Sequence, residues 1–206
     1  PVLFIPPGGN LKIWEKPIPE GSYLTVGLIG QKNVAIVLNK KTNTLVALHK
    51  STIPPLDFSV EIERLARYYN VSHLIIDKRG DGAAVLFDLQ GRYYPLLSAM
   101  RHKTEGIEYE IGWETKSENL PVVLASVVKY ANSRYLTIYD RETILDLGRI
   151  IGTDGSQIIT QSGDIDTILA LAIGTYLCEE NPYVIPKQRK EQKSRIPYRV
   201  FNYQAR

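Results

Sequence analysis

The feature of this 206-residue sequence that most limits its fold is one change in hydrophobic period. Before it, residues 23–29, 33–39 and 44–50 are short β-rich runs bounded by turn residues, which predicts an antiparallel three-stranded meander. After it, apolar residues recur at helical spacing from Phe58 to Tyr69. The chain is therefore expected to join a meander to a helix that packs against it.

The segment after this helix predicts that the sheet becomes mixed. Residues 73–77 are an apolar run that ends in an acid, as in a buried strand. A helix over residues 83–89 and a strand over 93–97 would complete a βαβ unit. Three antiparallel strands followed by parallel strands, flanked by helices, predict a ribonuclease H-like α/β fold. A topology of this kind does not by itself give a function.

The rest of the sequence predicts further elements of both kinds. These are a loop with a short hairpin over residues 98–119, helices over 121–132, 141–151 and from Gly163 on, and short strands over 135–138 and 157–160. We divide the chain into a Pro/Gly-rich extended segment or linker (1–21), one folded domain (22–182) and a basic tail (183–206).

Composition limits the class of protein. Hydrophobic residues make up 44% and charged residues 23%, which is ordinary for a folded soluble domain. We expect no transmembrane segment and no signal peptide. The first residue is not Met, so we expect a piece of a longer chain, and Cys178 is the single cysteine, which excludes an internal disulfide.

The charge is unevenly distributed. Residues 187–206 hold seven basic residues and one acidic residue, a net charge of +6, against +3 for the whole chain. Such a tail is typical of contacts with nucleic-acid phosphates, and a merely solvated chain end is the alternative. The candidate DNA-binding residues there are Lys187, Arg189, Lys190, Lys193 and Arg195.

Several chemistries are excluded by missing motifs. The sequence has no phosphate-binding loop of the G-x-x-x-x-G-K-[ST] type, no G-x-G-x-x-G after a strand and no G-x-S-x-G elbow. Its three scattered histidines and one cysteine do not make a zinc site.

Acidic residues remain as candidates for metal chemistry. Asp77 ends the buried strand, Asp164 and Asp166 open the last apolar helix, and Asp81 lies in a glycine turn. Hard cations such as Mg²⁺ prefer carboxylate oxygens, and two such ions can drive phosphodiester cleavage. The alternative for Asp77 and Asp81 is a turn or helix-cap residue, and that alternative is favoured by position alone. Capping would need only one of Asp164 and Asp166, since two acids at this spacing cannot both cap the helix in the same way.

An ordered set of motifs resembles the nuclease domain of the large terminase subunit of tailed bacteriophages. These motifs are a Tyr69-Asn70 helix end, a strand ending at Asp77 before a turn to Gly80–Gly82, Gly112-Trp113-Glu114-Thr115 leading to Pro121, the helix around Leu147, and Gly163-Asp164-Ile165-Asp166 before an Ala-rich helix. The resemblance covers about residues 14–178.

The resemblance implies a viral endonuclease that cuts concatemeric double-stranded DNA with Mg²⁺ or Mn²⁺ during DNA packaging. Asp77 and either Asp166 or Asp164 would bind metal, with Asp166 preferred, and Asp81 or Asp164 would be a substitute ligand for a missing acid. Apart from the resemblance, Lys78 and Arg79 beside Asp77 are candidate DNA-binding residues. The implied partners are an upstream ATPase domain, the portal and the small terminase subunit. The implied location is the host cytoplasm, without secretion or membrane contact.

One departure from the family pattern separates two hypotheses. The position of the first, metal-bridging Asp falls on Leu28, and no acid lies between Glu20 and Asp57. Retained Asp77 and Asp166 favour a metal-dependent nuclease. The missing acid favours a degenerate domain of the same fold that binds DNA or a partner in the packaging motor.

Overall fold

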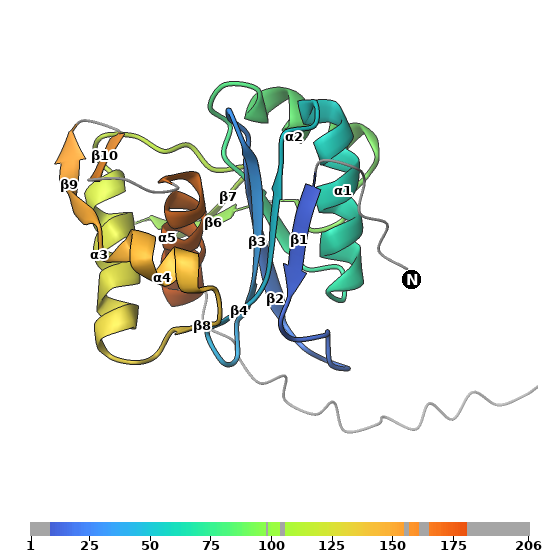
Figure 1. Cartoon of the computed structure of the whole chain (residues 1–206). Helices are drawn as coiled ribbons and strands as arrows, with labels where there is room; N and C mark the ends of the chain where they lie inside the picture. Colours follow the sequence, from blue (N-terminus) through green and yellow to red (C-terminus); the bar gives the residue numbers. More distant parts are fainter. Residues whose placement is uncertain (1–8, 98, 104–105, 155–156, 161–164, 181–206) are drawn as a thin grey trace, which may run out of the picture.

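The computed structural model describes residues 9–97, 99–103, 106–154, 157–160 and 165–180. Its centre is a six-stranded mixed sheet in the order β1-β4-β3-β2-β5, with β8 also paired to β4 (Figure 1). The strands of this sheet are β1 (Gly9–Ile13), β2 (Tyr23–Leu28), β3 (Asn33–Asn39), β4 (Thr44–Ser51), β5 (His73–Ile76) and β8 (Thr137–Ile138). The helices are α1 (Pro55–Tyr68), α2 (Gly82–Gly91), α3 (Leu120–Asn132), α4 (Arg141–Leu147) and α5 (Ile165–Glu180).

The expected meander and the change to parallel pairing are both confirmed. Strands β2, β3 and β4 pair antiparallel in chain order, and β5 returns through α1 to lie parallel to β2. The parallel register aligns Leu24 with His73 and Gly27 with Ile76. The carboxyl ends of β2 and β5 therefore meet at one end of the sheet.

Helices cover both faces of the sheet, and this explains why β2 and β3 are buried along their whole length. In Figure 1, α1 and α2 lie on one face, and α3, α4 and α5 lie on the other. Two apolar clusters fill the layers, one under α1 and α2 and one under α3 and α5. Helix α5 approaches β3 so closely that a Cβ on Gly174 would lie 2.6 Å from Leu38 Cδ1.

Part of the leading segment is extended, which is one of the two interpretations given for residues 1–21: Gly9–Ile13 forms β1 and pairs with β4. Residues 93–97 are not a strand; Leu97 makes one isolated bridge to Leu74. Tyr93 has a φ of 55° and residues 95–96 form a turn, so the segment does not run as an extended strand.

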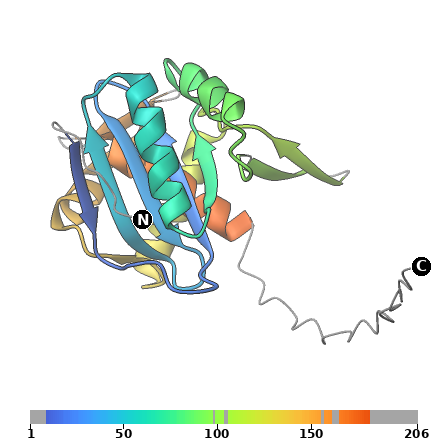
Figure 2. The same ribbon diagram turned by 90° about the vertical axis from the view of Figure 1, so that its right-hand side faces the viewer.

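The later half contains two hairpins outside the main sheet. They are β6 (Ala99–Lys103) with β7 (Gly106–Glu110), and β9 (Ile150–Asp154) with β10 (Gln157–Thr160). The first projects from the body in Figure 2 and agrees with the hairpin expected there. Helix α4 is shorter than expected: it ends at Leu147, Gly148 caps it, and β9 begins at Ile150.

The helices in the described part of the chain do not combine the length and the apolarity that are needed to span a bilayer.

Candidate functional site

The candidate site lies where β2 and β5 end together. Leu28 and Asp77 follow the last aligned pair of the parallel register, Gly27 and Ile76, and the Asp77 backbone N–H donates to the Gly27 carbonyl at 3.0 Å. Side chains alternate along a strand, so Asp77 faces the same layer as Ile75. That layer contains α3 and α5, and Leu28 packs in it. The two side chains therefore face one region.

Asp77 is 3% exposed, and both of its carboxylate oxygens are already engaged. Oδ1 accepts the backbone N–H of Arg79 at 3.1 Å, which is an Asx-type turn contact. Oδ2 accepts the Arg79 Nε–H at 3.0 Å and the Thr115 hydroxyl at 2.8 Å. The Arg79 guanidinium also forms an ion pair with Oδ2 through Nη2 at 3.0 Å. The buried charge is thus neutralised within the chain.

The loop that carries Thr115 is fixed to the end of β5. Trp113 donates its backbone N–H to the Ile76 carbonyl and accepts the Lys78 N–H, both at 2.7 Å. Gly112 has a φ of 76°, and a Cβ there would lie 3.1 Å from the Ile76 carbonyl oxygen, so glycine is required. Trp113 Nε1 donates to Thr115 Oγ1 at 3.1 Å, which aims the hydroxyl.

Thr115 is a site residue whose role sequence reasoning missed. The Gly-Trp-x-Thr motif is visible in the sequence, but its contact with Asp77 spans 38 residues and no local pattern indicates it. The motif is held from the other side by α5, because the Trp113 ring meets the Tyr176 ring edge-on with centroids 5.7 Å apart.

The other predicted site residues are placed as follows. Asp166 lies in the first turn of α5, half-buried, and its Oδ2 is 3.5 Å from where a Cβ of Gly30 would lie, just beyond β2. It therefore shares the end of the sheet with Leu28. Asp81 precedes α2, is exposed and makes no side-chain cap hydrogen bond. Lys78 packs its stem over Gly112.

The remaining candidates lie outside the described residues. They are Asp164 and the tail residues Lys187, Arg189, Lys190, Lys193 and Arg195.

The described residues do not fit a two-ion metal centre. Among them, no three His, Cys, Asp or Glu side chains form a group that could hold a metal ion. Leu28 offers no ligand atom where it adjoins Asp77, and the Asp77 oxygens accept from Arg79 and Thr115 instead.

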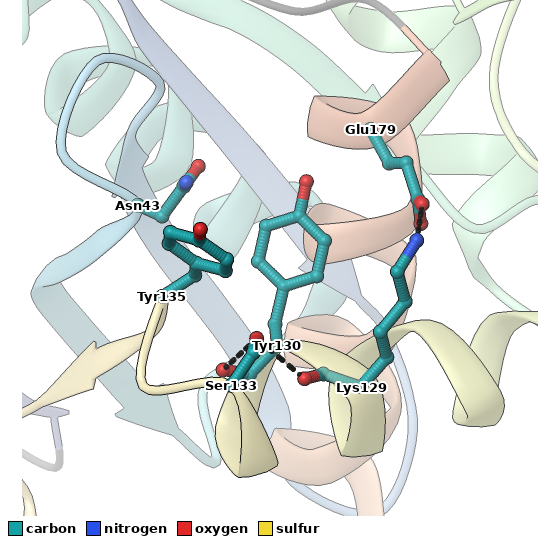
Figure 3. A pocket seen from close by; sticks show the side chains of 6 residues that line it. All are labelled: Asn43, Lys129, Tyr130, Ser133, Tyr135 and Glu179. Carbon is teal, nitrogen blue, oxygen red and sulfur yellow. Dashed lines mark hydrogen bonds and ion pairs between the residues drawn. The ribbon is translucent and has the colours of Figure 1, made fainter.

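A cavity of about 360 Å³ lies apart from this site (Figure 3). Its lining residues are Asn43, Lys129, Tyr130, Ser133, Tyr135 and Glu179. Two of the lining residues, Lys129 and Glu179, form an ion pair (Figure 3). Asn43 lies in the turn between β3 and β4, at the end of the sheet opposite Leu28, so the cavity does not belong to the candidate site.

Comparison with solved structures identifies the same fold in phage proteins. The large terminase nuclease of thermophilic phage G20c, with bound cobalt, gives a TM-score of 0.64 at 16% identity over 81% of this chain and 86% of that one. The large terminase nuclease domain of Thermus phage P74-26 gives 0.64 at 14% identity over 85% and 90%. The G20c nuclease is also known with magnesium and with zinc. No family model and no curated protein sequence matches this chain.

These likenesses confirm the expected ribonuclease H-like α/β fold and its similarity to terminase nuclease domains. Identities of 14–16% show the fold alone. The roles of Asp77, Asp166, Lys78 and Arg79 stay predictions.

Proposed function

We propose that this chain is a double-stranded DNA-binding domain of terminase-nuclease type that has lost a carboxylate needed for DNA cleavage. Its place would be a viral DNA-packaging motor acting in the host cytoplasm. The fold supports the family context, and the order of the motifs from Asp77 to Asp166 supports it independently.

One observation carries the proposal that cleavage is lost. A leucine, 4% exposed, adjoins Asp77 at the position where the family pattern has a bridging carboxylate. Two-ion cleavage needs a ligand shared by both ions, and a hydrocarbon side chain cannot supply it. Arg79 then balances the charge of Asp77 from within the chain.

A metal-dependent endonuclease is the second candidate. The observation that favours it is the position of Asp166, which lies against Gly30 at the same end of the sheet as Asp77. In this candidate Mg²⁺ or Mn²⁺ would be the cofactor, Asp77 and Asp166 would be ligands, and Asp81 or Asp164 would substitute for the missing acid.

Cleavage of supercoiled plasmid by the purified chain separates the two candidates. We expect no nicking in Mg²⁺ or Mn²⁺, while the protein remains folded by circular dichroism and binds the same DNA. Nicking that EDTA and Asp77→Ala both abolish would overturn the proposal that cleavage is lost and establish the nuclease.

The basic tail and the partner proteins belong to the same proposal. We infer that residues 187–206 contact DNA, and that an ATPase domain, the portal or the small terminase subunit is the neighbour in the motor. Deletion of these residues should weaken duplex binding and flatten its salt dependence, because the shortened chain would neutralise fewer phosphates and release fewer counterions on binding. Equal affinity at two salt concentrations would contradict a DNA-binding tail.

A further inference from the structure

We propose that Arg79 binds a DNA phosphate directly, as a fixed cation at the candidate site. The site would then bind the DNA backbone without a divalent ion. The inference rests on the proposed DNA-binding function and assigns the group that performs it. The ligand is a phosphodiester of duplex DNA.

The geometry of the guanidinium carries the first step. Arg79 uses Nε and Nη2 on Asp77 Oδ2, both at 3.0 Å. Its Nη1 has no partner among the described residues, and the side chain is 39% exposed. A guanidinium has five N–H donors, so one edge is held by the carboxylate and donors remain for an anion.

The orientation of the ion pair carries the second step. Asp77 is 3% exposed and Arg79 is 39% exposed, so the pair is a dipole whose positive end meets solvent. Thr115 and the Arg79 backbone N–H fix the carboxylate, and the carboxylate in turn fixes the guanidinium. A cation held in place loses little side-chain entropy when a phosphate binds.

The surroundings of Arg79 leave room for a ligand. The next residue, Gly80, has a φ of 54°, and a Cβ built on it meets no atom within 4 Å. The turn after β5 is therefore open on the side of Gly80. Lys78, on the other side of Arg79 in the sequence, adds a second positive charge to the same turn.

Fluorescence anisotropy with a short labelled duplex tests the inference. Affinity is measured for the full chain at several salt concentrations, in Mg²⁺ and in EDTA. We expect the wild-type affinity to be the same in both. Arg79→Gln should weaken binding about tenfold, and the slope of log affinity against log salt should fall by about 0.9, the value for one phosphate contact. Arg79→Lys should keep the salt slope and lose part of the affinity for the duplex. Lysine keeps the positive charge but lacks the planar guanidinium, which can donate two parallel hydrogen bonds.

Arg64→Gln is the matched control. Arg64 is 52% exposed and pairs with Glu61 on α1, on the other face of the sheet. We expect its binding curve to match the wild type. Circular dichroism melting of each variant confirms that it is folded.

The outcomes distinguish this inference from the proposed function. Duplex binding that is equal for Arg79→Gln and Arg64→Gln overturns the role of Arg79 and leaves the DNA-binding proposal standing. Duplex binding that EDTA abolishes overturns the proposal that the site binds DNA without a divalent ion. No duplex binding by the wild-type chain overturns the proposed function itself.

Discussion

Leu28 and Asp77 adjoin one another at the ends of two parallel strands and face the same layer of the protein. One side chain is a hydrocarbon and the other is a carboxylate that the chain neutralises itself. Substitutions of either member of this pair are therefore the most direct tests of whether this end of the sheet binds divalent ions.

Leu28→Asp should place a second buried carboxylate beside Asp77. In EDTA we expect a loss of roughly 3 kcal/mol in the free energy of unfolding, because the new charge is buried without a partner. Mn²⁺ should recover part of this loss and raise the melting temperature by about 5 °C, since a ligand that binds only the folded state stabilises it. Thermal melting with and without MnCl₂ measures both effects.

Leu28→Asn is the control for this change, because it has nearly the same shape without the charge. Its melting temperature should not respond to Mn²⁺. If Leu28→Asp and Leu28→Asn respond equally, the two strand ends are not close enough for their side chains to share an ion.

Asp77→Asn should destabilise the protein by about 2 kcal/mol. The change removes the charge that pairs with Arg79 and disturbs the acceptor of the buried Thr115 hydroxyl. Urea unfolding at pH 7 measures the effect. Asp81→Asn serves as the control, because Asp81 is exposed and makes no cap hydrogen bond, so its effect should stay within about 0.5 kcal/mol. Equal effects would show that the Asp77 contacts contribute nothing.

The fall in the free energy of unfolding at acid pH should depend in part on Asp140, the N-cap of α4. Burial acts to raise the pKa of its carboxyl, but hydrogen bonds from Lys12 at 2.8 Å and from Thr143 outweigh burial and hold the pKa below its ordinary value. A lowered pKa in the folded state stabilises the protein above the unfolded pKa of about 3.9, and this contribution is lost as the pH falls through the folded pKa.

Asp140→Asn should therefore cost about 1 kcal/mol at pH 7 and much less near pH 2. Urea unfolding at the two pH values gives the comparison. Glu142→Gln is the control: Glu142 is 72% exposed and lies 3.7 Å from the Lys12 amine, so little change is expected. A cost for Asp140→Asn that does not vary with pH would contradict the assignment.

Cys178 should be inert in the native protein. Burial among apolar side chains raises the pKa of its thiol to about 12, and only the thiolate reacts quickly. Labelling with a disulfide reagent at pH 8 should be at least about a hundredfold slower in buffer than in denaturant. Cys178→Ser removes the single cysteine and gives the blank. Fast labelling of the folded protein would show that the C-terminal turns of α5 open readily.

Short-range pattern predicted most of the fold, because the elements here are strongly periodic. The meander and β5 follow from short apolar runs bounded by turn residues, as expected for strands buried on both faces, and α1 follows from helical spacing. Residues 93–97 have the composition of a strand, but Tyr93 has a positive φ, residues 95–96 form a turn, and the strand pairing is one bridge at Leu97. Backbone conformation of this kind is not encoded in hydrophobic period.

The site was predictable in part. The position of Asp77 at the end of a strand is visible in the local sequence. Leu28 stands out because the first acid of the family pattern falls on it, and the pairing of β2 with β5 places it beside Asp77. The contact of Thr115 with Asp77 depends on how a distant loop lies against β5, which no single segment determines. The Arg79 ion pair is local, but only the burial of Asp77 shows that it neutralises the carboxylate.

The flank of β4 that faces away from β3 is shared by two segments far apart in the chain. Strand β1 pairs with Ala47–Ser51 of β4, and β8 pairs with Thr44 and Leu45. Lys12 and Asp140, 128 residues apart, join the two segments. A fragment that began at Gly21, where composition suggests the end of a linker, would lack β1. It would expose the main-chain groups of β4 as a template for another strand, and we expect such a fragment to self-associate.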